Sequence, residues 1–176
     1  MIYIDSSALV KRYVAEPGSE SIDRLLAEHP YAATSRLAYP EILSALNRKR
    51  ILGEFSSRVF GDLLKAFESD WGKLFVLELD DSLLPTIRQT IRKHSIRGAD
   101  AVHLASAMWL RSTLKEDVIF ACSDRKLLDA ARGERLVAFE PVGKTLFDYR
   151  GAVPNLGLTI DELRKKAIAH VVKRHE

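Results

Sequence analysis

The chain has 176 residues, 47% of them hydrophobic and 29% charged, which is enough apolar material for one globular domain. Its 27 Lys and Arg against 24 Asp and Glu give a formal charge of +3, which is compatible with a nucleic-acid partner but does not require one. The single cysteine excludes an intrachain disulfide, and no apolar stretch approaches the ~20 residues that span a bilayer. We therefore expect a cytoplasmic protein with no signal peptide and no membrane contact.

Five short apolar runs predict buried strands, because each is bounded by polar or turn-forming residues. In chain order they cover residues 2–4, 31–34, 74–77, 118–121 and 136–139. Helical patterns lie between them, over residues 19–26, 42–49, 55–67, 83–93, 99–110 and 126–132. Ser19 is the expected cap of the first helix, and Pro40 either lies in the first turn of the second or kinks it. Strands that alternate with helices predict an α/β domain with a mostly parallel sheet.

The last part of the chain has a different pattern. Residues 151–157 are rich in turn formers, and residues 159–162 have the sequence of a capping box at a helix start. In the residues that follow, apolar side chains recur at helical spacing on one face and basic side chains occupy the other face, which predicts an amphipathic helix. We therefore divide the chain into a main domain over residues 1–150 and a C-terminal extension over residues 151–176.

Four acidic residues occupy positions that suit a metal site. Asp5 and Asp124 each follow a predicted strand, and ligands of parallel sheets bind outside the carboxyl ends of strands. Glu41 and Asp100 lie in apolar helical segments, where an unpaired carboxylate is costly. Crowded carboxylates repel one another unless a cation neutralises them, and hard oxygen ligands suit Mg²⁺ or Mn²⁺. This pattern favours phosphodiester hydrolysis, in which bound metal activates water and stabilises charge on the phosphate.

Each acid also has an ordinary structural explanation. The two acids that follow strands fit turns or helix caps. Asp100 fits the first turn of a helix, where the helix dipole favours an acidic side chain. Glu41 fits an ion pair with Arg36 or Arg48. The sequence pattern alone leaves these alternatives open.

The acids and their surroundings resemble the PIN-domain VapC toxins. The resemblance rests on IYIDSSALVK (2–11), VAEPGSE (14–20), TSRLAYPE (34–41), DAVHLASA (100–107) and SDRKLLDAA (123–131), and it runs from residue 1 to about residue 139. It implies a three-layer α/β/α fold around a mostly parallel sheet. It also implies an Mg²⁺- or Mn²⁺-dependent endoribonuclease that cuts RNA, is often a homodimer, and has a cognate antitoxin. The catalytic, metal-binding acids that it implies are Asp5, Glu41, Asp100 and Asp124.

Four further residues are candidates for contacts with substrate or with the acids: Ser7, Arg97, His103 and Ser123. Ser7 has a hydroxyl that can orient a carboxylate or meet a phosphate. Many relatives have threonine where this chain has Cys122, so Ser123 is considered as an alternative hydroxyl. His103 either contacts substrate or is a packed structural histidine, and we favour the second because the chemistry does not need imidazole.

Two other functions compete with the nuclease. A non-catalytic RNA- or protein-binding module can use the same fold, although crowded carboxylates are ill suited to a polyanion without a metal. An aspartyl-phosphate phosphatase usually has a second aspartate two residues after the first, and that position here is Ser7. The sequence has no phosphate-binding loop and no dinucleotide fingerprint, so nucleotide-dependent enzymes rank low.

Overall fold

A five-stranded, fully parallel sheet forms the centre of the computed structural model, which describes residues 1–29 and 31–141. The strand order is β3-β2-β1-β4-β5. The strands are β1 (Ile2–Ile4), β2 (Ala32–Ser35), β3 (Phe75–Leu77), β4 (Ile119–Ala121) and β5 (Val137–Phe139). Each overlaps one of the five strands predicted from the apolar runs, which confirms the parallel α/β fold class.

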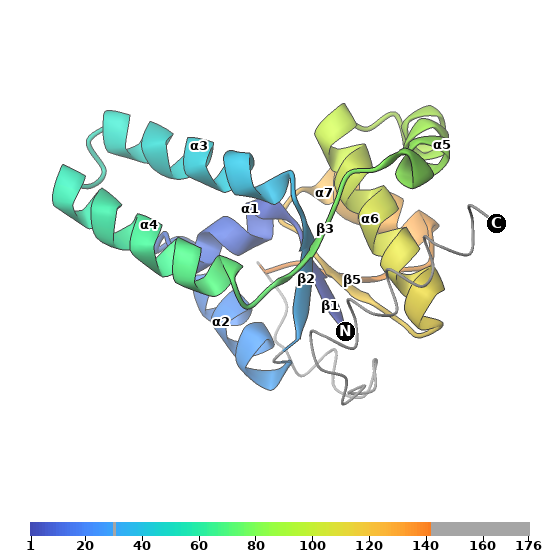
Figure 1. Ribbon diagram of the computed structural model, residues 1–176, viewed down its shortest axis with the longest axis horizontal. Coiled ribbons are helices and arrows are strands. Elements are labelled where there is room, and N and C mark those ends of the chain that lie inside the picture. Colours follow the sequence, from blue (N-terminus) through green and yellow to red (C-terminus); the bar gives the residue numbers. More distant parts are fainter. Residues whose placement is uncertain (30, 142–176) are drawn as a thin grey trace.

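Helices cover both faces of the sheet (Figure 1). They are α1 (Ser6–Leu9), α2 (Ser19–Glu28), α3 (Ala38–Ile51), α4 (Ser57–Trp71), α5 (Leu84–His94), α6 (Gly98–Leu114) and α7 (Arg125–Gly133). Helices α1 to α4 lie on one side and α5 to α7 on the other. The three-layer α/β/α arrangement is therefore confirmed, and each predicted helix within the described residues has its counterpart.

The alternation of side chains along the short strands divides the core into two parts. Ile2 and Ile4 point toward α1–α4, where they pack in one apolar cluster. Tyr3 and Phe120 point the other way and belong to the cluster under α5–α7, with their rings stacked at a centroid distance of 5.6 Å. Because both faces are covered, most strand positions are apolar. The buried hydroxyl of Thr34 on β2 is satisfied by donating to the carbonyl of Ile4 at 2.8 Å.

The strand order places the candidate site. The chain moves outward from β1 through β2 to β3, then crosses to the other side of β1 for β4 and β5. The order thus reverses between β1 and β4, the place where open α/β sheets bind ligands. The backbone N–H of Asp5 donates to the carbonyl of Ala121 at 2.9 Å, so the residues that follow these two strands lie at one edge.

The prediction that Ser19 caps α2 is wrong, and the structure decides between the two alternatives for Pro40. Helix α2 is capped by Gly18, whose left-handed φ of 96° suits glycine, and Ser19 is the first helical residue. The Ser19 hydroxyl instead closes the preceding loop, accepting from the N–H of Glu16 and donating to the carbonyl of Val14. Helix α3 begins two residues before Pro40, which therefore lies in the first turn, where its missing N–H costs little.

The predicted boundary at residue 150 and the predicted C-terminal helix lie outside the described residues. Within the ranges that the structure describes, no helix is both long enough and apolar enough to cross a membrane.

Replacing Phe120 with alanine tests the central packing. The side chain is fully buried on β4 and stacks on Tyr3, so its loss leaves a cavity that the sheet cannot close. We expect Phe120→Ala to lower the free energy of unfolding by about 3–5 kcal/mol in urea titrations followed by circular dichroism. Val59→Ala, at an exposed position of α4, should change it by less than about 0.5 kcal/mol. A loss below about 1 kcal/mol for Phe120→Ala would contradict this packing.

Candidate active site

The carboxylate of Asp5 lies buried at the end of the central strand, with only 4% of the residue exposed. Its Oδ2 accepts hydrogen bonds from the backbone N–H of Ser7 at 3.1 Å and from the Ser7 hydroxyl at 2.5 Å. The thiol of Cys122 donates to the same oxygen at 3.4 Å. Asp5 also caps α1, so the helix start and the catalytic candidate are one residue. These bonds fix the orientation of the carboxylate.

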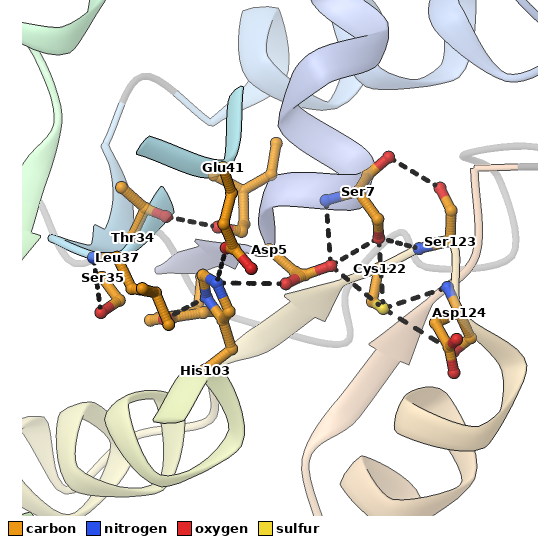
Figure 2. A network of polar contacts seen from close by, with 12 residues as sticks. Asp5, Ser7, Thr34, Ser35, Leu37, Glu41, His103, Cys122, Ser123 and Asp124 are labelled. Carbon is orange, nitrogen blue, oxygen red and sulfur yellow. Dashed lines mark hydrogen bonds and ion pairs between the residues drawn. The ribbon is translucent and has the colours of Figure 1, made fainter. Parts of the chain in front are cut away.

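A second group of contacts joins the end of β1 to the loop after β4 (Figure 2). The Ser7 hydroxyl accepts from the N–H of Ser123 at 3.0 Å, and the Ser123 hydroxyl donates to the Ser7 carbonyl at 3.2 Å. The sulfur of Cys122 accepts from the N–H of Asp124 at 3.2 Å. The loop that carries Asp124 is thereby tied to the strand end that carries Asp5.

His103 connects two of the four predicted acids. It is 1% exposed on α6, and its Nε2 lies 2.9 Å from Glu41 Oε2 and 3.5 Å from Asp5 Oδ1. Because a carboxylate can only accept, Nε2 donates to Glu41. The other ring nitrogen, Nδ1, bonds to the hydroxyl of Tyr3 at 2.9 Å. The histidine is thus packed in the core, as expected, and it also belongs to the network of acids (Figure 2).

Electrostatics within this network favour charge on both partners. Burial disfavours the imidazolium, but the nearby carboxylates of Asp5 and Glu41 outweigh it, so the pKa of His103 is raised. Burial likewise opposes the Glu41 carboxylate, but hydrogen bonds from His103 and Ser6 and the charge of His103 prevail. The pKa of Glu41 therefore lies below its ordinary value. Glu41 is held by an imidazole and not by an arginine, and Arg36 pairs with Glu78.

Asp100 and Asp124 approach the site from helix starts. Asp100 lies in the first turn of α6 and accepts from the N–H of Arg97 at 3.3 Å. Burial, followed by the negative charges of Asp5 and Asp124, raises the pKa of Asp100. Asp124 is exposed and caps α7 by accepting from the N–H of Leu127 at 2.9 Å. The first-turn role of Asp100 and the capping role of Asp124 are the structural alternatives that the sequence left open. Both residues also contribute negative charge to the carboxyl edge of the sheet.

The donor set fits a hard divalent cation, because it consists of carboxylate oxygens with no thiolate available. Burial raises the pKa of the Cys122 thiol, which keeps it protonated as a hydrogen-bond donor. In this arrangement no three His, Cys, Asp or Glu side chains of the described residues are grouped as ligands of one ion. Two of the four acids are engaged by donors of the protein: Asp124 accepts from the N–H of Leu127, and Glu41 accepts from His103.

Sequence reasoning missed three contributors to the network. Tyr3 holds the far side of His103, Cys122 donates to Asp5, and Ser6 donates to Glu41. Tyr3 carried a detectable signal, since a tyrosine within a buried strand needs a partner for its hydroxyl. The hydroxyl of Ser123 bonds to a backbone carbonyl and not to a carboxylate, so the thiol contacts Asp5 instead.

Comparison with known families identifies the chain. A family model described as PIN domain matches residues 2–133. The chain belongs to the PIN-domain family. Ribonuclease VapC49 of Mycobacterium tuberculosis is 35% identical over 108 residues, which cover 61% of this chain and 75% of that protein. Ribonuclease VapC46 of the same organism is 33% identical over 147 residues, which cover 80% of this chain and 97% of that protein. Within the PIN family, the chain is therefore of the VapC type.

Solved structures confirm the fold. The crystal structure of FitAcB from Neisseria gonorrhoeae matches with a TM-score of 0.59 at 17% identity, covering 80% of this chain and 98% of that chain. A toxin-antitoxin complex from Klebsiella pneumoniae also matches with a TM-score of 0.59, at 12% identity over 82% of this chain and all of that chain. At such low identities these matches support the PIN-like α/β/α architecture alone.

Replacing Asp100 with asparagine should stabilise the metal-free protein. The fold raises the pKa of Asp100, so its contribution to stability becomes unfavourable as pH rises through that pKa. Asparagine removes the charge and keeps an oxygen for the N–H of Arg97. We expect Asp100→Asn to raise the free energy of unfolding by up to about 1 kcal/mol at neutral pH in EDTA, with the gain shrinking toward pH 4.

Asp100→Ala is the matched control, because it removes both the charge and the hydrogen bond to Arg97. It should therefore gain less than Asp100→Asn. Thermal unfolding followed by circular dichroism measures both variants. Destabilisation by Asp100→Asn in EDTA at neutral pH would contradict charge crowding at this edge.

Proposed function

We propose that this PIN-domain protein is a divalent-metal-dependent endoribonuclease, the toxin of a toxin–antitoxin pair. The observation that carries the proposal is the carboxylate of Asp5, which is buried at the carboxyl edge of the sheet and lies 3.5 Å from the imidazole that holds Glu41. Cys122 ties the same carboxylate to the loop of Asp124. Burial, with smaller contributions from the charges of Asp5 and Asp124, raises the pKa of Asp100 at this edge. Relatives of VapC type that are 35% and 33% identical to this chain over 108 and 147 aligned residues are named ribonucleases.

Each site residue has a proposed role that follows from its position. Asp5, Asp100 and Asp124 are proposed as the principal metal ligands, and Glu41 completes or supports the site directly or through water. Mg²⁺ or Mn²⁺ held there would supply an activated water and neutralise charge at the phosphate, and hydrolysis would leave 5′-phosphate and 3′-hydroxyl ends. Ser7 and Cys122 hold Oδ2 of Asp5, which fixes the direction of its other oxygen.

His103 has a positioning role in this proposal. It donates to Glu41 from a site buried against Tyr3, so the glutamate has one defined orientation in the absence of metal. A charged imidazole beside Glu41 and Asp5 also offsets part of the repulsion among the acids. Arg97 lies at the start of α6 and its charge acts on Asp100, so we propose it for substrate contact.

The partners follow from the proposed activity. The substrate is RNA, and a cognate antitoxin is proposed to block the edge that carries the acids. The Klebsiella pneumoniae structure that shares the fold is described as a toxin-antitoxin complex, which supports such a partner here. A homodimer is proposed as the working assembly.

A non-catalytic binding module remains the second candidate. The buried position of Asp5 argues against it, since a module that binds a polyanion gains nothing from a carboxylate buried beside further acids. The two candidates differ in one measurable property, the dependence of RNA cleavage on metal and on the acids.

RNA cleavage by the purified full chain, freed of any antitoxin, tests the proposal. We expect cleavage of labelled tRNA and rRNA fragments in Mg²⁺ or Mn²⁺, and none in EDTA. Asp5→Asn should lower the cleavage rate by about 10²-fold or more, since even residues that only orient metal ligands contribute 10–100-fold. Asp62→Asn, an exposed acid on α4, is the matched control and should cleave at the original rate.

Two results would overturn the proposal. Cleavage that survives both EDTA and Asp5→Asn would show that the acids do not carry the activity. A folded protein that neither binds Mn²⁺ nor cuts any fragment would favour the binding module instead.

A further inference from the structure

The stretch of chain that leads into Asp100 carries basic residues and no acidic ones. Residues 82–99 contain no Asp or Glu and four Lys or Arg, whereas the whole chain has a formal charge of +3. The four are Arg88, Arg92, Lys93 and Arg97. This segment consists of α5 and the turn into α6, and it ends at Asp100.

The exposed face of α5 carries two cations that have no counter-charge within the described residues. Arg88 and Arg92 are exposed and stand one helical turn apart, about 6 Å along the axis. Neither forms an ion pair with any residue that the structure describes, whereas Lys93 pairs with Glu134 at 2.9 Å. A shallow hollow of about 430 Å³ lies over this face, lined by Pro85, Arg88, Gln89, Arg92 and Lys93.

This face continues to the acid edge through two further cations. After α5 the chain turns at Ser95, whose carbonyl accepts from the ammonium group of Lys126 at 2.5 Å. Lys126 lies two residues after Asp124 on α7. Arg97 caps α6 and gives its backbone N–H to Asp100. These contacts place Lys126 and Arg97 beside the turn that joins α5 to Asp100.

We propose that this surface binds the RNA backbone: Arg88 and Arg92 contact phosphates of the strand whose scissile phosphate lies at the acids, with Arg97 and Lys126 between them. The inference rests on the proposed function and extends it to the path of the substrate. Arginine suits this role because its guanidinium can hold two phosphate oxygens at once. The spacing of the two side chains by one helical turn is close to that of successive phosphates along a strand.

RNA fits this face better than a second copy of the chain. In a two-fold dimer the same patch meets itself, so Arg88 and Arg92 would face like charges. The exposed apolar side chains of Leu84 and Ile91 lie on the same helix and can contact sugars or bases beside the phosphates.

Binding of single-stranded RNA in EDTA, measured by fluorescence anisotropy at several salt concentrations, tests the site apart from cleavage. The full chain carrying Asp5→Asn is compared with the same chain carrying Arg88→Ala and Arg92→Ala as well. We expect about tenfold weaker binding at 0.1 M salt. We also expect the slope of log affinity against log salt to fall by about 1.4, because each lost phosphate contact removes about 0.7.

The matched control carries Arg24→Ala and Arg58→Ala, which remove the same charge from exposed positions on α2 and on the start of α4, on the far side of the sheet (Figure 1). It should bind RNA with nearly the original slope. Equal slopes for the two double variants would overturn the proposal, as would a change of oligomeric state in the α5 variant without a change in RNA binding.

A cleavage assay keeps this inference separate from the proposed function. With the native Asp5 and bound Mg²⁺, Arg88→Ala with Arg92→Ala should raise KM about tenfold and leave kcat unchanged. If the unaltered chain binds RNA through α5 but never cuts it, the nuclease proposal fails while the binding site stands. If the chain cuts RNA and the α5 variant has the original KM, the site fails while the nuclease stands.

Discussion

The buried carboxylate of Asp5 is the feature on which the rest of this structure depends. A charge that is almost fully removed from water is tolerated only where donors surround it. Here those donors come from different parts of the chain: the start of α1 through Ser7, and the end of β4 through Cys122. The pairing of β1 with β4 brings these donors together, so the strand order of the sheet also builds the surroundings of Asp5.

The same edge contains a conflict between folding and proposed function. Asp100 and Asp124 add negative charge beside Asp5, and the pKa of Asp100 is raised, chiefly by burial and in smaller part by these neighbouring charges. His103 offsets part of the negative charge at Glu41 and Asp5, whereas neither Asp100 nor Asp124 forms an ion pair with any residue that the structure describes. Proteins commonly sacrifice stability at sites whose chemistry demands it. The α5 face lies next to this negative edge and supplies the positive charge that a polyanion needs on its way to the acids.

Much of the fold could be predicted from the sequence, because buried parallel strands and amphipathic helices leave strong periodic patterns. The positions of the acids relative to the strands and helices could be predicted too, since Asp5 and Asp124 follow apolar runs and Glu41 lies in an apolar helix, whereas their role as metal ligands stays a prediction. Which contacts they make could not be predicted. The partner of Glu41 is His103, 62 residues away, and an arginine nearer in sequence was the natural expectation. Such pairs depend on how α3 and α6 pack, which local patterns do not encode.

The cap of α2 and the contacts of Cys122 and Tyr3 could not be predicted for a similar reason. Ser19 is a good capping residue by composition, but the left-handed backbone at Gly18 moves the helix start by one position. The contact of Cys122 with Asp5 depends on side-chain direction after β4, where a thiol stands in the place of the expected hydroxyl. Tyr3 became part of the network only because the strand alternation turns it toward α6. The sequence indicates which residues are candidates for the site, and tertiary packing determines which of them are in contact.

We propose that Asp5, Asp100 and Asp124 bind one divalent cation after rotation of their side chains. Crystals of the full chain grown with Mn²⁺ test it most directly, through an anomalous difference map recorded at the manganese edge. We predict a strong peak within coordinating distance of Asp5, Asp100 and Asp124, with Asp124 turned away from the N–H of Leu127. A map with no peak among these carboxylates, from crystals of protein that cleaves RNA in Mn²⁺, would contradict the account.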